Sequence, residues 1–125
     1  MNKYIAMFLL VAQTASAQNL SDENWLCVAD KLKVQFSGGE SMESTNNTKF
    51  MFNPAKGFKL FSFPDLYGAC QYFDGKIACS QIFEDDNNTL NVQLFIFEST
   101  HNSFNFTNII EVGNVNSFFG SCSLL

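Results

Sequence analysis

The fold of this chain is decided by the stretch Ala69-Cys70-Gln71-Tyr72-Phe73-Asp74-Gly75-Lys76-Ile77-Ala78-Cys79. Asp-Gly is the dipeptide that best accepts the positive φ angles of a two-residue type I′ turn, so we expect two antiparallel strands to meet at Asp74 and Gly75. Counting outward from this turn places Cys70 opposite Cys79, in a non-hydrogen-bonded pair whose Cα atoms lie about 4.5 Å apart. This separation suits a disulfide, and the hairpin therefore predicts a Cys70–Cys79 bond.

The other two cysteines are then left to pair with each other. Four cysteines allow three connectivities, and the hairpin selects the one that joins Cys27 to Cys122, near the two ends of the domain. In the chain-entropy description, so long a loop stabilises the fold by about 4.7 kcal/mol and the short hairpin loop by somewhat under about 3 kcal/mol. Two disulfides in so short a chain predict an oxidising compartment.

The first 17 residues have the pattern of a secretory signal peptide. Lys3 supplies a basic start, residues 5–12 form an apolar run that is too short to cross a bilayer, and Ala15-Ser16-Ala17 is a small-residue cleavage site. Cleavage after Ala17 would leave residues 18–125 as a single β-rich domain. We therefore expect the mature protein to be secreted or periplasmic.

The charge pattern argues against nucleic acid as a partner. Without Lys3 the formal net charge changes from −5 to −6, and the sequence contains no arginine. Arginine is the usual bidentate reader of phosphate and of guanine, so its absence disfavours nucleic-acid binding. Negative charge also disfavours anionic membrane surfaces, and no stretch of the mature chain is long enough to predict a membrane-spanning helix.

Short strands with turn signals at close spacing are expected along the whole mature chain. Apolar and polar residues alternate from Leu90 to Phe97, and Pro54 and Gly57 predict the turn of a second hairpin. The sequence thus predicts an all-β fold, a small antiparallel barrel or sandwich of about seven or eight strands that is held by disulfides. A Cys27–Cys122 bond fits a barrel in which the first and last strands meet.

The start of the domain carries two competing signals. Ser21-Asp22-Glu23, followed by apolar residues at helical spacing, predicts a short N-terminal helix or irregular segment to about Ala29. The alternation from Lys31 to Phe36 then predicts the first strand. Residues 37–47 are polar and contain two adjacent glycines, so we expect a loop there.

Several strands carry apolar residues on both faces. In the strand 90–97, alternation predicts that the leucines, the valine and the isoleucine face the interior. A second apolar face is then formed by Phe61, Phe63, Phe95 and Phe97. This face is interpreted either as buried under another part of the fold or as an exposed aromatic site that binds a protein or an apolar small ligand.

Catalytic and metal-binding groups are scarce. The single histidine, His101, lies in a polar stretch with no sequence sign of an orienting carboxylate, and the serines lack a Gly-x-Ser-x-Gly setting. The acidic stretch 84–88 lacks the glycine and the distal glutamate of an EF-hand loop, and the cysteines are expected in disulfides. We therefore expect no catalytic residue, no metal and no cofactor.

Four Asn-x-Ser/Thr sequons are candidate glycosylation sites in a eukaryotic host, and each is expected to be exposed to solvent: Asn19, Asn46, Asn87 and Asn105.

These features favour a small secreted or periplasmic, non-enzymatic binding domain with an aromatic-rich surface or cavity. In size and disulfide content the chain is also similar to small periplasmic barrels that inhibit lysozyme, and Ser37-Gly38-Gly39-Glu40 is the nearest counterpart of their Ser-Gly-containing inhibitory loop. This resemblance implies an alternative function, inhibition of a basic hydrolase such as lysozyme through a polar loop, toward which the acidic charge would steer the chain.

Overall fold

The computed structural model describes residues 20–111 and 113–125, so the expected signal peptide (1–17) and Asn19 lie outside the described residues. Nine strands and no helix are found in this part of the chain. The strands are β1 (Trp25–Gln35), β2 (Ser41–Thr45), β3 (Lys49–Asn53), β4 (Gly57–Leu60), β5 (Ala69–Phe73), β6 (Lys76–Glu84), β7 (Leu90–Glu98), β8 (Ser103–Ile110) and β9 (Val115–Leu124). The described part of the chain thus holds no helix that is long and apolar enough to span a membrane.

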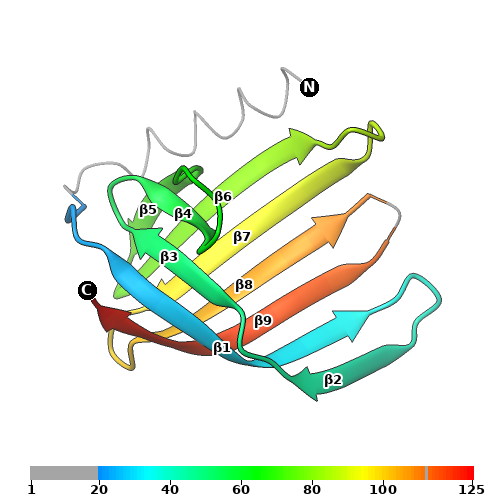
Figure 1. Cartoon of the computed structure of the whole chain (residues 1–125), viewed down its shortest axis with the longest axis horizontal. Helices are drawn as coiled ribbons and strands as arrows, with labels where there is room; N and C mark the ends of the chain where they lie inside the picture. Colours follow the sequence, from blue (N-terminus) through cyan, green and yellow to red (C-terminus); the bar gives the residue numbers. More distant parts are fainter. Residues whose placement is uncertain (1–19, 112) are drawn as a thin grey trace.

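The strands form one strongly curved antiparallel sheet that almost closes into a barrel (Figure 1). Eight strands follow one another in the order β4-β3-β1-β9-β8-β7-β6-β5, and β2 pairs with the outer half of β1 beside this path. The expected all-β architecture is confirmed, and the barrel alternative is the one adopted. The first and last strands meet, because β1 pairs with β9 along nearly its whole length.

The central hairpin has the register that the Asp-Gly turn predicts. Phe73 pairs with Lys76, and Asp74 and Gly75 adopt φ angles of 42° and 87°. Cys70 is bonded to Cys79, with their Cα atoms 3.9 Å apart. Cys27 of β1 is bonded to Cys122 of β9 with the same Cα separation, so both predicted disulfides are confirmed.

Two expectations for the N-terminal part are wrong. The segment 25–29 is extended in β1 and not helical, because Trp25, Cys27 and Ala29 face the interior with the two-residue period of a strand. Residues 41–45, expected in a loop, form β2. A register shift between Ala29 and Lys31 divides β1, so that its first half pairs with β3 and its second half with β2.

The facing of β7 is also the reverse of the expectation. The positions predicted to face inward were Leu90, Val92, Leu94 and Ile96; the interior instead receives Asn91, Gln93, Phe95 and Phe97. Phe95 is fully buried and Phe97 is 3% exposed. Two of the four inward positions are amides, so the count of apolar residues favours the wrong face.

Pairing in register arranges the inward side chains of β6–β9 in rows across the sheet. The first two rows are apolar: Ile77–Phe97–Phe104–Gly120 and Cys79–Phe95–Phe106–Phe118. Phe50 of β3 packs against this wall from the opposite side of the barrel, with ring centroids 4.9 Å from Phe106 and 5.5 Å from Phe104. Such tilted and edge-on aromatic pairs contribute roughly 0.5–1.5 kcal/mol each beyond their area burial, so this cluster is the main core.

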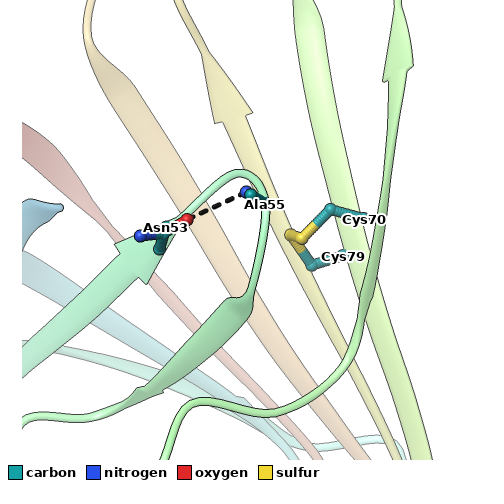
Figure 2. Close-up of a disulfide and its surroundings, with 4 residues drawn as sticks. All are labelled: Asn53, Ala55, Cys70 and Cys79. Atoms are coloured by element: carbon teal, nitrogen blue, oxygen red, sulfur yellow. Dashed lines mark hydrogen bonds between the residues drawn. A yellow bond between two sulfur atoms is a disulfide. The ribbon is translucent and has the colours of Figure 1, made fainter. Parts of the chain in front are cut away.

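The turn between β3 and β4 lies beside the Cys70–Cys79 bond (Figure 2). Asn53 is 1% exposed, and its side-chain oxygen accepts a hydrogen bond from the N–H of Ala55 at 2.9 Å. Its amide nitrogen donates to side-chain oxygens of Asp22 at 2.8 Å and Asn24 at 3.0 Å. Asn53 therefore fastens the segment before β1 to the turn and keeps its own buried polar atoms paired.

The barrel closes at a seam between β4 and the residues that precede β5. Phe58 and Tyr67 exchange two backbone hydrogen bonds there, with N···O distances of 2.9 and 3.1 Å. Gly57 has a φ of 112°, and a Cβ atom at this position would overlap the carbonyl oxygen of Tyr67. Only glycine permits both the backbone angle and the close approach, so the seam depends on Gly57.

We expect Gly57→Ala to destabilise the protein by at least about 2 kcal/mol, because it combines a disfavoured φ with a backbone clash. The matched control is Gly38→Ala, at a site where nothing lies within 4 Å of the added Cβ, and we expect it to change stability by less than about 0.5 kcal/mol. Urea unfolding of the two oxidised variants measures both effects. Equal stabilities would show that the seam does not need a glycine.

Candidate ligand-binding cavity

A partly enclosed cavity of about 520 Å³ lies inside the barrel, beyond the aromatic core and toward the end where β6 turns into β7. Its volume falls in the range of small-molecule sites, roughly 300–1,000 Å³. Seven segments contribute its wall: β3, β4, the 61–67 connection, β6, β7, β8 and β9. The lining residues are Phe50, Phe58, Leu60, Phe63, Tyr67, Gln81, Phe83, Gln93, Phe106, Asn108, Asn116 and Phe118.

The floor of the cavity is apolar and rigid. Phe50 and Phe58 are fully buried, and Phe106 is 6% exposed. Phe106 is packed between its neighbours, with ring centroids 5.8 Å from Phe58 and 5.9 Å from Phe118. Because each ring is wedged against at least one other, the floor keeps its shape when the cavity fills or empties.

The wall above this floor is polar. The third row of inward residues across β6, β7, β8 and β9, which we call the amide row, consists of Gln81, Gln93, Asn108 and Asn116. Each amide is directly opposite the next in the strand register, so neighbouring heads are spaced by the distance between strands, about 4.8 Å. The amide row therefore lies across one wall of an otherwise largely apolar cavity.

Three of these amides have unused hydrogen-bonding capacity. In the described part of the chain, Oε1 of Gln81, Oε1 of Gln93 and Oδ1 of Asn108 are buried and have no hydrogen-bond partner. A buried acceptor without a partner costs roughly 1–3 kcal/mol, so such atoms are rare in folded proteins and need an explanation. Their common placement on the wall of the cavity makes this wall the candidate binding site.

The cavity carries no formal charge. None of its lining residues is Asp, Glu, Lys or His. Burial raises the pKa of the Tyr67 phenol above its ordinary value near 10, so this hydroxyl also stays neutral at physiological pH. A site of this kind favours an uncharged ligand, because an ion would lose its hydration without gaining a counter-charge.

The 61–67 connection borders the cavity and is held by Lys59. The Lys59 ammonium donates to the carbonyl oxygens of Phe61 and Phe63 and lies 5.9 Å from the centre of the Phe61 ring. Phe63 lines the cavity while it is 47% exposed. Strand β4 ends at Leu60, and the two phenylalanines beyond it lie in a surface turn.

The four phenylalanines expected to share one face are not brought together. Phe95 and Phe97 are in the core, which is the buried alternative of the interpretation above. Phe61 and Phe63 are 48% and 47% exposed, and of the four residues Phe63 alone is among those that line the cavity. Binding by Phe61 stays a prediction.

The remaining candidate residues lie away from the cavity. His101 is exposed, and its Nδ1 atom lies 3.9 Å from Oε1 of Glu98. Asn87 is exposed, whereas Asn46 and Asn105 are half-buried, with Asn105 on the outer face of β8. No group of three or more metal-ligating side chains is found among residues 20–111 and 113–125.

The amide row is not among the candidate sites that the sequence predicts. On each strand, the residue two positions away on the same face is apolar, such as Phe95 for Gln93 and Phe106 for Asn108, so the amides do not form a polar face of their own. The signal that could have found it is an amide at the same height on four consecutive predicted strands. This signal becomes visible only after the strand register is known.

No relative of this chain was found among known proteins. No protein-family model matches the chain, and no curated protein or solved structure matches it either. The class that the fold and the cavity define is therefore structural: a small disulfide-bonded β-barrel with an internal cavity.

The acidic turn at this end of the barrel is organised by Asp85. Its carboxylate accepts hydrogen bonds from the N–H groups of Asn87 at 2.9 Å and Thr89 at 3.0 Å, and from the Asn91 amide at 3.3 Å. The hydrogen bond from the Thr89 backbone is the largest cause that lowers the pKa of Asp85. The charged carboxylate of Asp85 therefore stabilises the β6–β7 turn through these hydrogen bonds.

We expect Asp85→Asn to destabilise the protein at neutral pH and to have no effect in strong acid. A carboxyl whose pKa is lowered by folding stabilises the native state above its unfolded pKa, near 3.9, and this contribution is lost as the pH falls through the lower folded value. Urea midpoints of the wild type and the variant at pH 7 and pH 2 test this, with exposed Asp86→Asn as the control. A stability gap that is the same at both pH values would contradict the assignment.

Proposed function

We propose that this protein is a secreted or periplasmic, non-enzymatic binding protein that holds an apolar small ligand inside its barrel. The observation that carries the proposal is the uncharged cavity of about 520 Å³ with a preformed phenylalanine floor. Preformed, mostly apolar cavities with a few polar groups are typical of small-ligand sites. The two disulfides support an oxidising compartment.

The proposed absence of catalysis is supported by the chemistry of the wall. The cavity is lined by phenylalanines, amides, a leucine and a tyrosine whose pKa is raised, so its wall offers no activated nucleophile and no general base near neutral pH. Amides and aromatic rings bind and orient a ligand without changing it.

Leu60→Trp tests the proposal by filling the cavity from β4. We expect the wild type to bind the neutral fluorophore N-phenyl-1-naphthylamine, and Leu60→Trp to bind it at least about tenfold more weakly, because the indole occupies the space of the ligand. Ile109→Trp, at an exposed position of β8 outside the cavity, is the matched control and should bind like the wild type.

Far-UV circular dichroism and thermal unfolding establish that both variants are folded. The proposal fails if the wild type does not bind the fluorophore, or if folded Leu60→Trp binds it as tightly as the wild type does.

Inhibition of a basic hydrolase is the second candidate function. Residues 37–40 form the tip of the β1–β2 hairpin, and every residue from Gln35 to Thr45 is exposed (Figure 1). An exposed hairpin tip that carries Glu40 on an acidic protein is suited to a basic partner. We expect this function to show as inhibition of a basic lysozyme that weakens with added salt, and an absence of inhibition at low ionic strength excludes it.

A further inference from the structure

The amide row offers more hydrogen-bonding capacity than an apolar ligand can use. A hydrocarbon held on the phenylalanine floor would leave Oε1 of Gln81, Oε1 of Gln93 and Oδ1 of Asn108 buried and without a donor. Each of these residues lines the cavity, so a turn of its amide head about the last side-chain torsion presents the oxygen to a donor there. A ligand without a donor leaves these oxygens unpaired and binds more weakly than one that supplies it.

The position of the amide row relative to the floor defines two halves of the cavity. Phe106 and Phe118 lie two residues from Asn108 and Asn116 along β8 and β9, so the apolar and the polar halves are adjacent and face the same space. A molecule that fills both halves must be apolar at one end and polar at the other.

The unpaired atoms specify the polar end further. They are acceptors, so they require donors, and hydroxyl, amine and amide N–H groups are the donors of small molecules. The lining residues include neither a cation to pair with a carboxylate or phosphate nor an anion to pair with an ammonium ion. Charged heads are therefore excluded by desolvation, and neutral donors are left.

We infer that the amide row binds the head of an uncharged amphiphile, a molecule with an aliphatic body and one or more hydroxyl or amide donors, and selects it over fatty-acid anions and hydrocarbons. This inference rests on the proposed function and names its ligand class. Three acceptors spaced by the strand separation, about 4.8 Å, extend over roughly 10 Å, so a head with more than one donor uses the row most fully.

Three ligands with the same number of carbon atoms test the need for a donor and the preference for a neutral head: decan-1-ol, which has a donor; 1-methoxynonane, an ether with as many heavy atoms as the alcohol and no donor; and decanoate, which is charged at pH 7.5. Each is titrated against the complex of the protein with N-phenyl-1-naphthylamine. We expect the alcohol to displace the fluorophore at least about tenfold more effectively than the ether, because a site with a buried polar group rejects the analogue that cannot pair with it. Decanoate should be the weakest competitor.

Gln93→Met provides the decisive variant, since it keeps the length of the side chain and removes the acceptor. The preference for alcohol over ether should fall to within about twofold in this variant. Gln71→Met is the matched control, because Oε1 of Gln71 is also buried and unpaired but belongs to a residue of β5 that pairs with Ala78 and does not line the cavity. It should leave the preference unchanged. Asn108→Leu repeats the test at a second position of the amide row.

The outcomes distinguish this inference from the proposed function. Equal displacement by the alcohol and the ether overturns the role of the amide row but leaves an apolar cavity. Decanoate as the strongest competitor overturns the neutral head. A preference that persists in both Gln93→Met and Asn108→Leu also overturns the inference. If the wild type binds neither the fluorophore nor any of the three ligands, the proposed function itself fails.

Discussion

The register between neighbouring strands is the constraint on which the interior of this barrel depends. Side chains alternate between the two faces of a strand, so a slip by one residue would move every phenylalanine of β7 from the core to the solvent. Two covalent bonds oppose such a slip. Cys70–Cys79 fixes β5 against β6 and Cys27–Cys122 fixes β1 against β9, at opposite ends of the run of strands that carries the aromatic rows.

The same register produces both the core and the cavity. Two rows of inward residues are apolar and meet Phe50 across the barrel, which fills that part of the interior. In the third row the amides of Gln93 and Asn108 replace phenylalanine, and the interior is no longer filled by rings. The transition from core to binding site thus occurs over one step of two residues along each strand. The polar wall and the apolar floor are parts of one sheet, which positions them rigidly relative to each other.

The sequence predicts most of the scaffold, because local signals determine it. The Asp74-Gly75 turn fixes one hairpin, and the pairing of four cysteines follows from it. The facing of β7 and the strand at 41–45 could not be predicted in this way. Apolar residues occupy both faces of β7, so its orientation is decided by Phe50 and the other rings it meets across the barrel. The strand at 41–45 forms because β1 extends past its bulge and offers a free edge. Both depend on contacts between distant parts of the chain.

The closure of the barrel at a single bridge has a mechanical consequence. Every other neighbouring pair of strands on the path shares a ladder of paired residues, whereas the seam is held by two backbone hydrogen bonds between Phe58 and Tyr67. Both residues also border the cavity. The seam is therefore the weakest point in the barrel wall beside the cavity, and parting of these two backbones would widen the barrel while both disulfides stay intact. One bridge between two residues that border the cavity thus keeps the hydrogen-bonded circumference closed.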